Sequence, residues 1–264
     1  MTGYTVLWVA AAAALASPLG GLIALLVRST TLFMSLALGF AGGVLLATIS
    51  LEMLPQALET SSLAAVVAGF TAGFLAVHLL DRFINRGALA GEKAEQFARV
   101  TRFHKRYRPR GDEVTVLAGA TSIEELIEGL SIGVGAAIRP GLGFMIAAAI
   151  VVDNLAEALS IGELARAGEK EGKGKPVRRV LKWTGLIGVS LFGSAIVGWF
   201  ALRGLSQAVL GTLIAAGAGG MFYLTVTDLL PEAEERHYQQ SAALAIAAGF
   251  MTILALGHLS RGGA

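Results

Sequence analysis

Residues 124–133 read Glu-Glu-Leu-Ile-Glu-Gly-Leu-Ser-Ile-Gly, and residues 153–162 read Asp-Asn-Leu-Ala-Glu-Ala-Leu-Ser-Ile-Gly. An acid, an acid or amide, a leucine, another acid and Leu-Ser-Ile-Gly recur in the same register. Each stretch lies inside a long apolar run, at 114–138 and 141–162. Consecutive membrane-spanning helices run in opposite directions, so these stretches predict an inverted repeat with acids at membrane depth. That arrangement is typical of secondary transporters.

The rest of the chain has the composition of a membrane protein. Hydrophobic residues make up 55% and charged residues 15%, and the mean hydropathy is +0.67, whereas soluble domains have about 25% charged residues. A helix needs about 20 apolar residues to cross a bilayer. Eight runs qualify: 4–27, 32–54, 63–80, 114–138, 141–162, 183–202, 205–227 and 240–259. The alternating pattern of a β-barrel is absent. We predict an all-α, polytopic fold, with one transmembrane domain over residues 1–264.

Basic residues concentrate in two loops between the predicted spans. Nine fall between Arg82 and Arg110, and seven fall between Arg166 and Lys182. By the positive-inside rule the loops at about 85–112 and 166–182 are cytoplasmic, and eight spans then place both termini outside. The distribution of the basic residues therefore indicates how the chain is oriented in a cell membrane, the inner or plasma membrane of a prokaryote. The net charge of +2 does not point to a nucleic-acid partner.

We interpret both loops as flexible linkers whose positive charge determines the membrane topology. The alternative for the first loop is that residues 103–108, Phe-His-Lys-Arg-Tyr-Arg, contact anionic lipid headgroups. Membrane lipids are partners in either case, and pairing of two copies into a homodimer stays open.

Acidic side chains gather on one face of each repeated stretch. Glu124 and Glu128 are four residues apart, as are Asp153 and Glu157, so each pair shares a helix face. Five unpaired acids at the bilayer centre would cost roughly 12–18 kcal/mol on insertion scales. Protonation, exposure to a water-filled cavity or a bound cation would relieve that cost. A divalent cation does so directly, because oxygen ligands suit Mg, Ca and Mn and tolerate Fe and Zn. The predicted metal-ligating residues are Glu124, Glu125, Glu128, Asp153, Asn154 and Glu157.

A weaker repeat joins the second and seventh spans. Residues 41–43, Ala-Gly-Gly, precede Glu-Met-Leu-Pro at 52–55, and residues 218–220, also Ala-Gly-Gly, precede Asp-Leu-Leu-Pro at 228–231. We expect each proline to end its helix. Glu52 and Asp228 are then either groups of the transport pathway or ordinary charges at helix ends.

These residues resemble the ZIP (Zrt/Irt-like) family of divalent-metal transporters. The family's fourth-helix pattern, His-Asn-x-Pro-Glu-Gly, falls on residues 124–129, and its fifth-helix pattern, (His/Gln)-(Asn/Asp/Glu)-x-Pro-Glu-Gly, falls on 153–158. The family's histidine is Glu124 here, and its two prolines are Ile127 and Ala156. The sixth span has no acid at the position where many family members have Glu-Pro. The polar residues nearest to that position are Ser190 and Ser194.

The resemblance implies a binuclear metal site between the fourth and fifth helices. One metal would be held by Glu124, Glu128 and Glu157. The other would be held by Glu125, Asn154 and the shared Glu128 and Glu157, with Asp153 as a further charge. The implied protein is a transporter working by alternating access, with Zn, Mn or Fe(II) as its substrate and no organic cofactor.

Two other functions compete with transport. One is a membrane sensor that binds metal without moving it. The other is an intramembrane hydrolase using paired acids, although no His-Glu-x-x-His motif occurs and no Gly-x-Gly-Asp lies in a span. The preferred metal stays open, and the absence of histidine from spans four and five predicts a broad preference that includes manganese or iron(II).

Overall fold

The computed structural model describes residues 3–27, 30–84, 113–170, 175–235 and 238–262, and these form helices without any strand. The helices, in chain order, are α1 (Gly3–Leu26), α2 (Thr31–Ala47), η1 (Thr48–Met53), α3 (Leu54–Thr60), α4 (Leu63–Ile84), α6 (Glu113–Ile138), α7 (Pro140–Lys170), α8 (Pro176–Leu202), α9 (Gln207–Leu224), η2 (Thr225–Leu229), α10 (Leu230–Glu235) and α11 (Gln239–Gly262). The predicted cytoplasmic loop 85–112, with its lipid-contacting stretch 103–108, lies outside the described residues.

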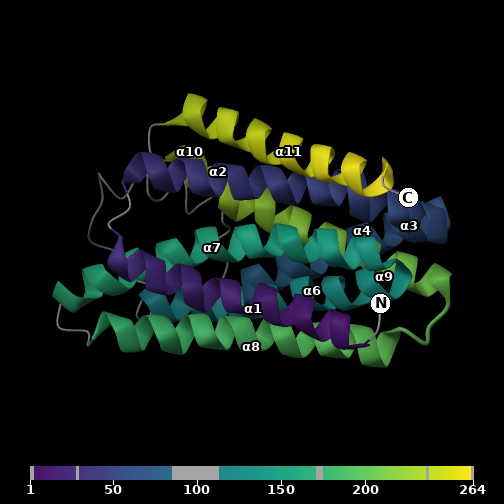
Figure 1. Cartoon of the computed structure of the whole chain (residues 1–264), viewed down its shortest axis with the longest axis horizontal. Helices are drawn as coiled ribbons and strands as arrows, with labels where there is room; N and C mark the ends of the chain where they lie inside the picture. The colour runs from purple at the N-terminus through teal and green to yellow at the C-terminus, as the bar shows by residue number, and fades with distance from the viewer. Residues whose placement is uncertain (1–2, 28–29, 85–112, 171–174, 236–237, 263–264) are drawn as a thin grey trace.

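The helices account for all eight predicted spans. Seven continuous helical segments among the described residues are long and apolar enough to cross a membrane. The eighth is α6, which has 26 residues and carries three glutamates in its middle. Figure 1 shows the two chain ends at the same end of the bundle, as an even number of crossings requires. The predicted all-α polytopic fold is confirmed. We refer to this end as the terminal end and to the opposite end as the loop end.

The long helices pack as two groups. The first group contains α1, α6, α7 and α8, and the second contains α2, α4, α9 and α11 with the short helices attached to them. In Figure 1, α2 and α11 lie in the upper part and α1 and α8 in the lower part, and the groups meet where α6 contacts α9 and α2 contacts α7. Small residues bring backbones close within a group: a Cβ at Gly43 of α2 would collide with the carbonyl oxygen of Ile246 in α11. Each group is thus tightly packed internally.

The expectation that two prolines end their helices is wrong. Pro55 and Pro231 are each preceded by a π-helical turn, η1 or η2, and the helix continues beyond them. A proline removes one backbone donor and clashes with the carbonyl four residues earlier. In the π turns the amides of Leu54 and Leu230 bond instead to the carbonyls five residues earlier, on Ile49 and Thr225. This wider turn accommodates the proline ring, so the weaker sequence repeat corresponds to a structural one.

Candidate metal centre

The two helices that carry the predicted ligands form a tight antiparallel hairpin. Only Arg139 separates the end of α6 from the start of α7, where Pro140 occupies the first helical position. At 1.5 Å per residue, Glu124 and Glu125 lie about 21–23 Å from this turn along α6, and Asp153 and Asn154 lie about 21–23 Å from it along α7. The repeated stretches therefore reach the same depth of the bundle.

Five acids share one volume between α6 and α7. Glu125, Glu128, Asp153 and Asn154 are at most 5% exposed, whereas Glu124 and Glu157 are partly buried. The carboxyl group of Glu157 interacts electrostatically with those of all four other acids, and Asn154 lies beside Glu125. The structure thus brings together all six residues predicted as ligands.

Several polar atoms of this cluster have no hydrogen-bond partner within the described part of the chain. These atoms are Oε2 of Glu125, Oε2 of Glu128, Oδ1 of Asp153 and both side-chain polar atoms of Asn154. Leaving a buried polar atom unbonded costs about 1–3 kcal/mol, and more if it is charged. Arg139, at the far end of the hairpin, is the one basic residue between 121 and 162. Oxygens without partners are what a bound cation requires.

The cluster is not a preformed cage. Among the described residues, no three Asp, Glu or His side chains stand close enough together to enclose an ion. The terminal torsion of a glutamate is soft, so its carboxylate turns at little cost. The acids therefore offer several oxygen atoms in one region between α6 and α7, and the carboxylates would have to turn toward a cation to bind it.

Helix α8 holds α6 in place behind the cluster. Ser194 donates hydrogen bonds to the carbonyl oxygens of Glu125 (3.1 Å) and Leu191 (3.0 Å). A side chain at Gly129 would collide with Ser194, so this glycine permits the close approach of the two helices. Ser194 was one of the two polar residues noted in the sixth span, and it contacts the backbone of the ligand helix rather than a carboxylate.

One polar link to the site was not predicted from the sequence. Ser160, one turn after Glu157 on α7, donates a 3.0 Å hydrogen bond to Oε1 of Glu232 on α10. This bond joins the two helix groups. The available signal was Glu232 itself, which directly follows the proline of the weaker repeat.

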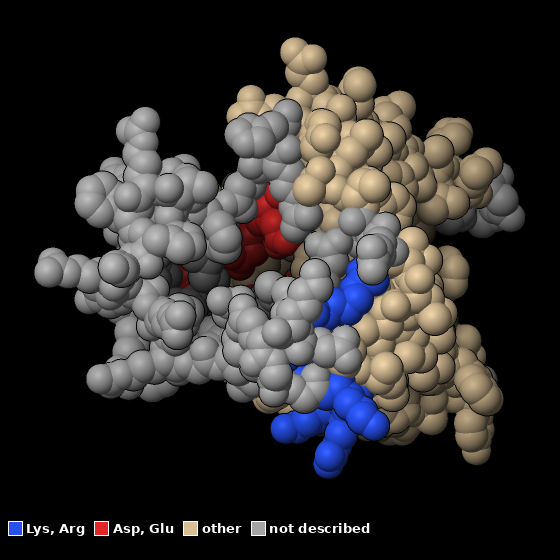
Figure 2. Space-filling view, turned by 90° about the vertical axis from the view of Figure 1, so that its left-hand side faces the viewer, with Lys and Arg blue, Asp and Glu red and all other residues tan. Residues whose placement is uncertain are grey.

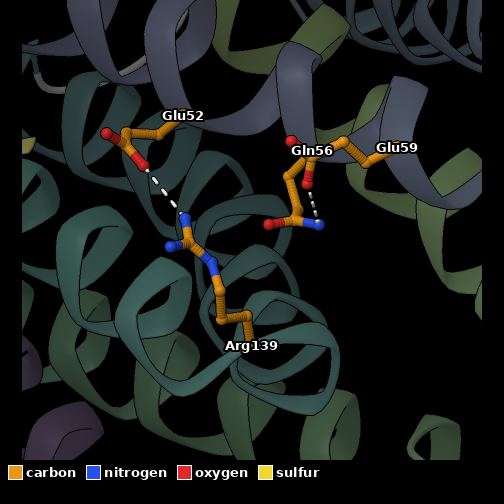
Figure 3. A network of polar contacts seen from close by, with 4 residues as sticks. All are labelled: Glu52, Gln56, Glu59 and Arg139. Carbon is orange, nitrogen blue, oxygen red and sulfur yellow. Dashed lines mark hydrogen bonds and ion pairs between the residues drawn. The ribbon is translucent and has the colours of Figure 1, made fainter. Parts of the chain in front are cut away.

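Glu52 and Asp228 lie on the two π turns. The Glu52 side chain is buried and forms an ion pair with Arg139 toward the terminal end, which excludes the interpretation as a solvated helix-end charge (Figure 3). Asp228 is half-buried on η2, toward the loop end. Figure 2 views the loop end, where acidic side chains of the described residues are visible. Lys175, Arg178 and Lys182 are exposed on the first turns of α8.

The fold and the cluster together define a class of protein. Eight long helices, most of them apolar enough to cross a membrane, enclose buried carboxylates with unpartnered oxygens, an arrangement that suits a membrane protein that handles cations. Comparison with known proteins agrees. The family described as "ZIP Zinc transporter" matches residues 103–257, and the chain belongs to this family. It is a transporter and not an enzyme.

Bacterial relatives match nearly the whole chain. "Zinc transporter ZupT" of Chlorobium phaeovibrioides is 31% identical, over 96% of this chain and 96% of the relative. The protein with the same description from Nitratidesulfovibrio vulgaris is 31% identical, over 92% of each chain. That from Corynebacterium glutamicum is 29% identical, over 92% of this chain and 94% of the relative. The predicted membership of the ZIP family is confirmed.

Proposed function

We propose that the chain moves divalent metal cations across the membrane by alternating access, through the carboxylate cluster between α6 and α7. The observation that carries this proposal is the set of buried oxygens without partners on Glu125, Glu128 and Asp153. Burying such groups is costly unless a cation compensates them. The presence of these groups at membrane depth therefore supports the binding of a cation there.

Two metal ions fit the acids present. By resemblance to the family, Glu124, Glu128 and Glu157 take one ion, and Glu125 and Asn154 take the other. Glu128 and Glu157 are shared. Glu157 on α7 lies close enough to the other four acids to interact electrostatically with each of them, which is compatible with a shared position.

The two groups of helices suit a transporter that exposes one site to either side. Both ligand helices belong to the first group, so the cluster moves with that group as a unit. Acidic side chains are visible at the loop end (Figure 2). Toward the terminal end, Ile132, Ile146 and Met53 are fully buried. We infer from this contrast that the conformation is open toward the loop end.

The cargo we infer is zinc together with manganese or iron(II). The relatives are described as zinc transporters, and carboxylates do bind zinc. All six proposed ligands offer oxygen, however, and without imidazole zinc loses part of its advantage over harder ions. The relatives are bacterial, which supports a place in the inner membrane. The loop end, with its exposed basic residues on α8, would face the cytoplasm.

Uptake by purified protein tests the proposal. The full chain in proteoliposomes is offered Zn²⁺, Mn²⁺ and Fe²⁺ separately, and Glu157→Ala is compared with Glu234→Ala, an exposed acid on α10. We expect uptake by the parent and by Glu234→Ala, and none by Glu157→Ala. No uptake of any metal by a parent that still binds metal would leave a sensor rather than a transporter.

A further inference from the structure

A buried carboxylate at the terminal end holds an arginine from the other helix group. Nη2 of Arg139 lies 3.3 Å from Oε2 of Glu52, and the two side chains are 42% and 2% exposed (Figure 3). Gln56, one turn further along, donates instead to Glu59, at 3.1 Å. Glu52 is thus the acid that meets Arg139.

The ion pair bridges the two parts that alternating access must separate. Arg139 is the single residue that connects α6 to α7, and Glu52 lies on η1 within the second group. Glu128 precedes Arg139 by eleven residues, which places the pair about 16 Å from the cluster along α6. Movement of the α6–α7 hairpin relative to η1 would have to break it.

A buried apolar side chain lies between the pair and the cluster. Met53, adjacent to Glu52, is fully buried. A side chain at Gly217 of α9 would contact both Met53 and Ser131, and Ser131 lies one turn from Glu128 on α6. Met53 therefore lies at the junction of the two groups, between the ion pair and the acidic cluster.

We propose that Glu52 is a cation-binding site at the terminal mouth of the path, and that Arg139 fills it as a tethered counter-cation until a divalent ion displaces it. A buried carboxylate left alone is costly, so the pair stays closed while no other cation is present. Arginine cannot release Glu52 by losing a proton, whereas a doubly charged ion competes directly for the carboxylate. The inference rests on the proposed function for the transport path, the relative movement of the two helix groups and the identity of the cargo.

Labelling of a buried cysteine tests this gate. The chain has no native cysteine, so Met53→Cys is a single reporter at the junction, and Gly204→Cys at the same end, with open space around it, reports full exposure. An impermeant maleimide is applied to intact cells in which Gly204→Cys is labelled. Glu52→Gln or Arg139→Gln should speed labelling of Met53→Cys by about threefold or more, the effect of losing a partly screened ion pair.

Two controls separate the gate from general loosening. The exchanged pair E52R/R139E should return labelling toward the parental rate. Arg203→Gln removes an exposed arginine that stacks on Trp199 and Phe200 at the same end, and it should change nothing. Unchanged labelling in both single variants, or no recovery in the exchanged pair, would overturn the gate.

Manganese tests the displacement itself. Mn²⁺ outside the cells should speed labelling of Met53→Cys in the parent and not in the Glu52→Gln background. The acceleration should persist with Glu157→Ala, because that change damages the cluster and not the mouth. No acceleration in the parent, or its loss with Glu157→Ala, would show that Glu52 is not a cation site. Labelling does not require flux, so a failure of transport would leave this result interpretable.

Discussion

The two π turns share their sequence signals and differ in their surroundings. Each follows an Ala-Gly-Gly triplet, carries one acid and precedes a proline. On η1, Glu52 is buried and ion-paired to the α6–α7 turn. On η2, Asp228 is half-buried toward the end where acidic side chains are visible in Figure 2. One local motif, used twice in opposite directions, thus lies in two different surroundings. Under the proposed function, these surroundings correspond to the closed and the open side of one state of the transport cycle.

The largest expected effect on metal uptake comes from changes in the acidic cluster between α6 and α7, which the proposed function makes accessible from either end. Glu128→Ala should abolish metal uptake, since it removes an oxygen donor that we propose bridges two ions. The loss should exceed the roughly 10–100-fold typical of outer partners of a metal site. The measurement is initial uptake in proteoliposomes, with Glu234→Ala as the matched control and melting temperature as the check on folding. Normal transport by Glu128→Ala would place the path elsewhere.

The second prediction assigns the two ends to the two sides of the membrane. A cysteine at Gly204, at the terminal end, should react with an impermeant thiol reagent in intact cells. A cysteine at Lys175, at the loop end, should react only after the cells are opened, because the positive-inside rule predicts that the basic end faces the cytoplasm. The reverse pattern would invert the orientation while keeping the contrast between the ends.

A smaller effect is expected on stability at the closed end. Arg139→Ala removes the positive charge beside the buried Glu52, so unfolding should become easier by about 1–2 kcal/mol, less than the 3–5 kcal/mol of a fully buried pair because Arg139 is partly solvated. Glu52→Gln should cost less, since it leaves no buried charge. The double variant should resemble Glu52→Gln alone in a thermal or denaturant melt. Additive losses would mean that the two residues act independently.

The smallest effect concerns selectivity. Glu124→His restores the imidazole that the family pattern has at this position, and it should move the preference toward zinc. We expect the zinc-to-manganese ratio in a competition assay to change by about tenfold, equivalent to ~1.4 kcal/mol in relative affinity. Glu59→His, on the exposed end of α3, is the control. A parent that excludes manganese, with a ratio unaltered by the histidine, would contradict the oxygen-ligand argument.

The membrane spans and the clustering of the acids were predictable from sequence because both follow from local periodicity. An apolar run of about 20 residues has few alternatives to a membrane helix. A four-residue spacing puts Glu124 and Glu128 on one face whatever surrounds them. The one-residue turn at Arg139 then fixes the depth at which the two ligand helices meet.

The remaining features depend on contacts between distant parts of the chain. Pro55 was expected to end a helix because a proline usually does, but a π turn shifts the hydrogen bonds by one residue and the helix continues. The bond from Ser160 to Glu232 joins residues 72 positions apart. The pairing of Glu52 with Arg139, 87 positions apart, has no signature in local spacing either. Such pairs are decided by how the two groups pack.

Metal binding to the purified chain tests the central claim most directly, that the oxygens between α6 and α7 hold the cargo. Titration of the detergent-solubilised protein with Mn²⁺, followed by the loss of the free-ion electron paramagnetic resonance signal, gives the number of ions bound per chain. We predict two ions for the parent and for Glu234→Ala, and a loss of the tight sites in Glu128→Ala and Glu157→Ala, because both ions share these two carboxylates. A parent that binds no Mn²⁺ or Zn²⁺, or a Glu128→Ala variant that binds as the parent does, would contradict the account.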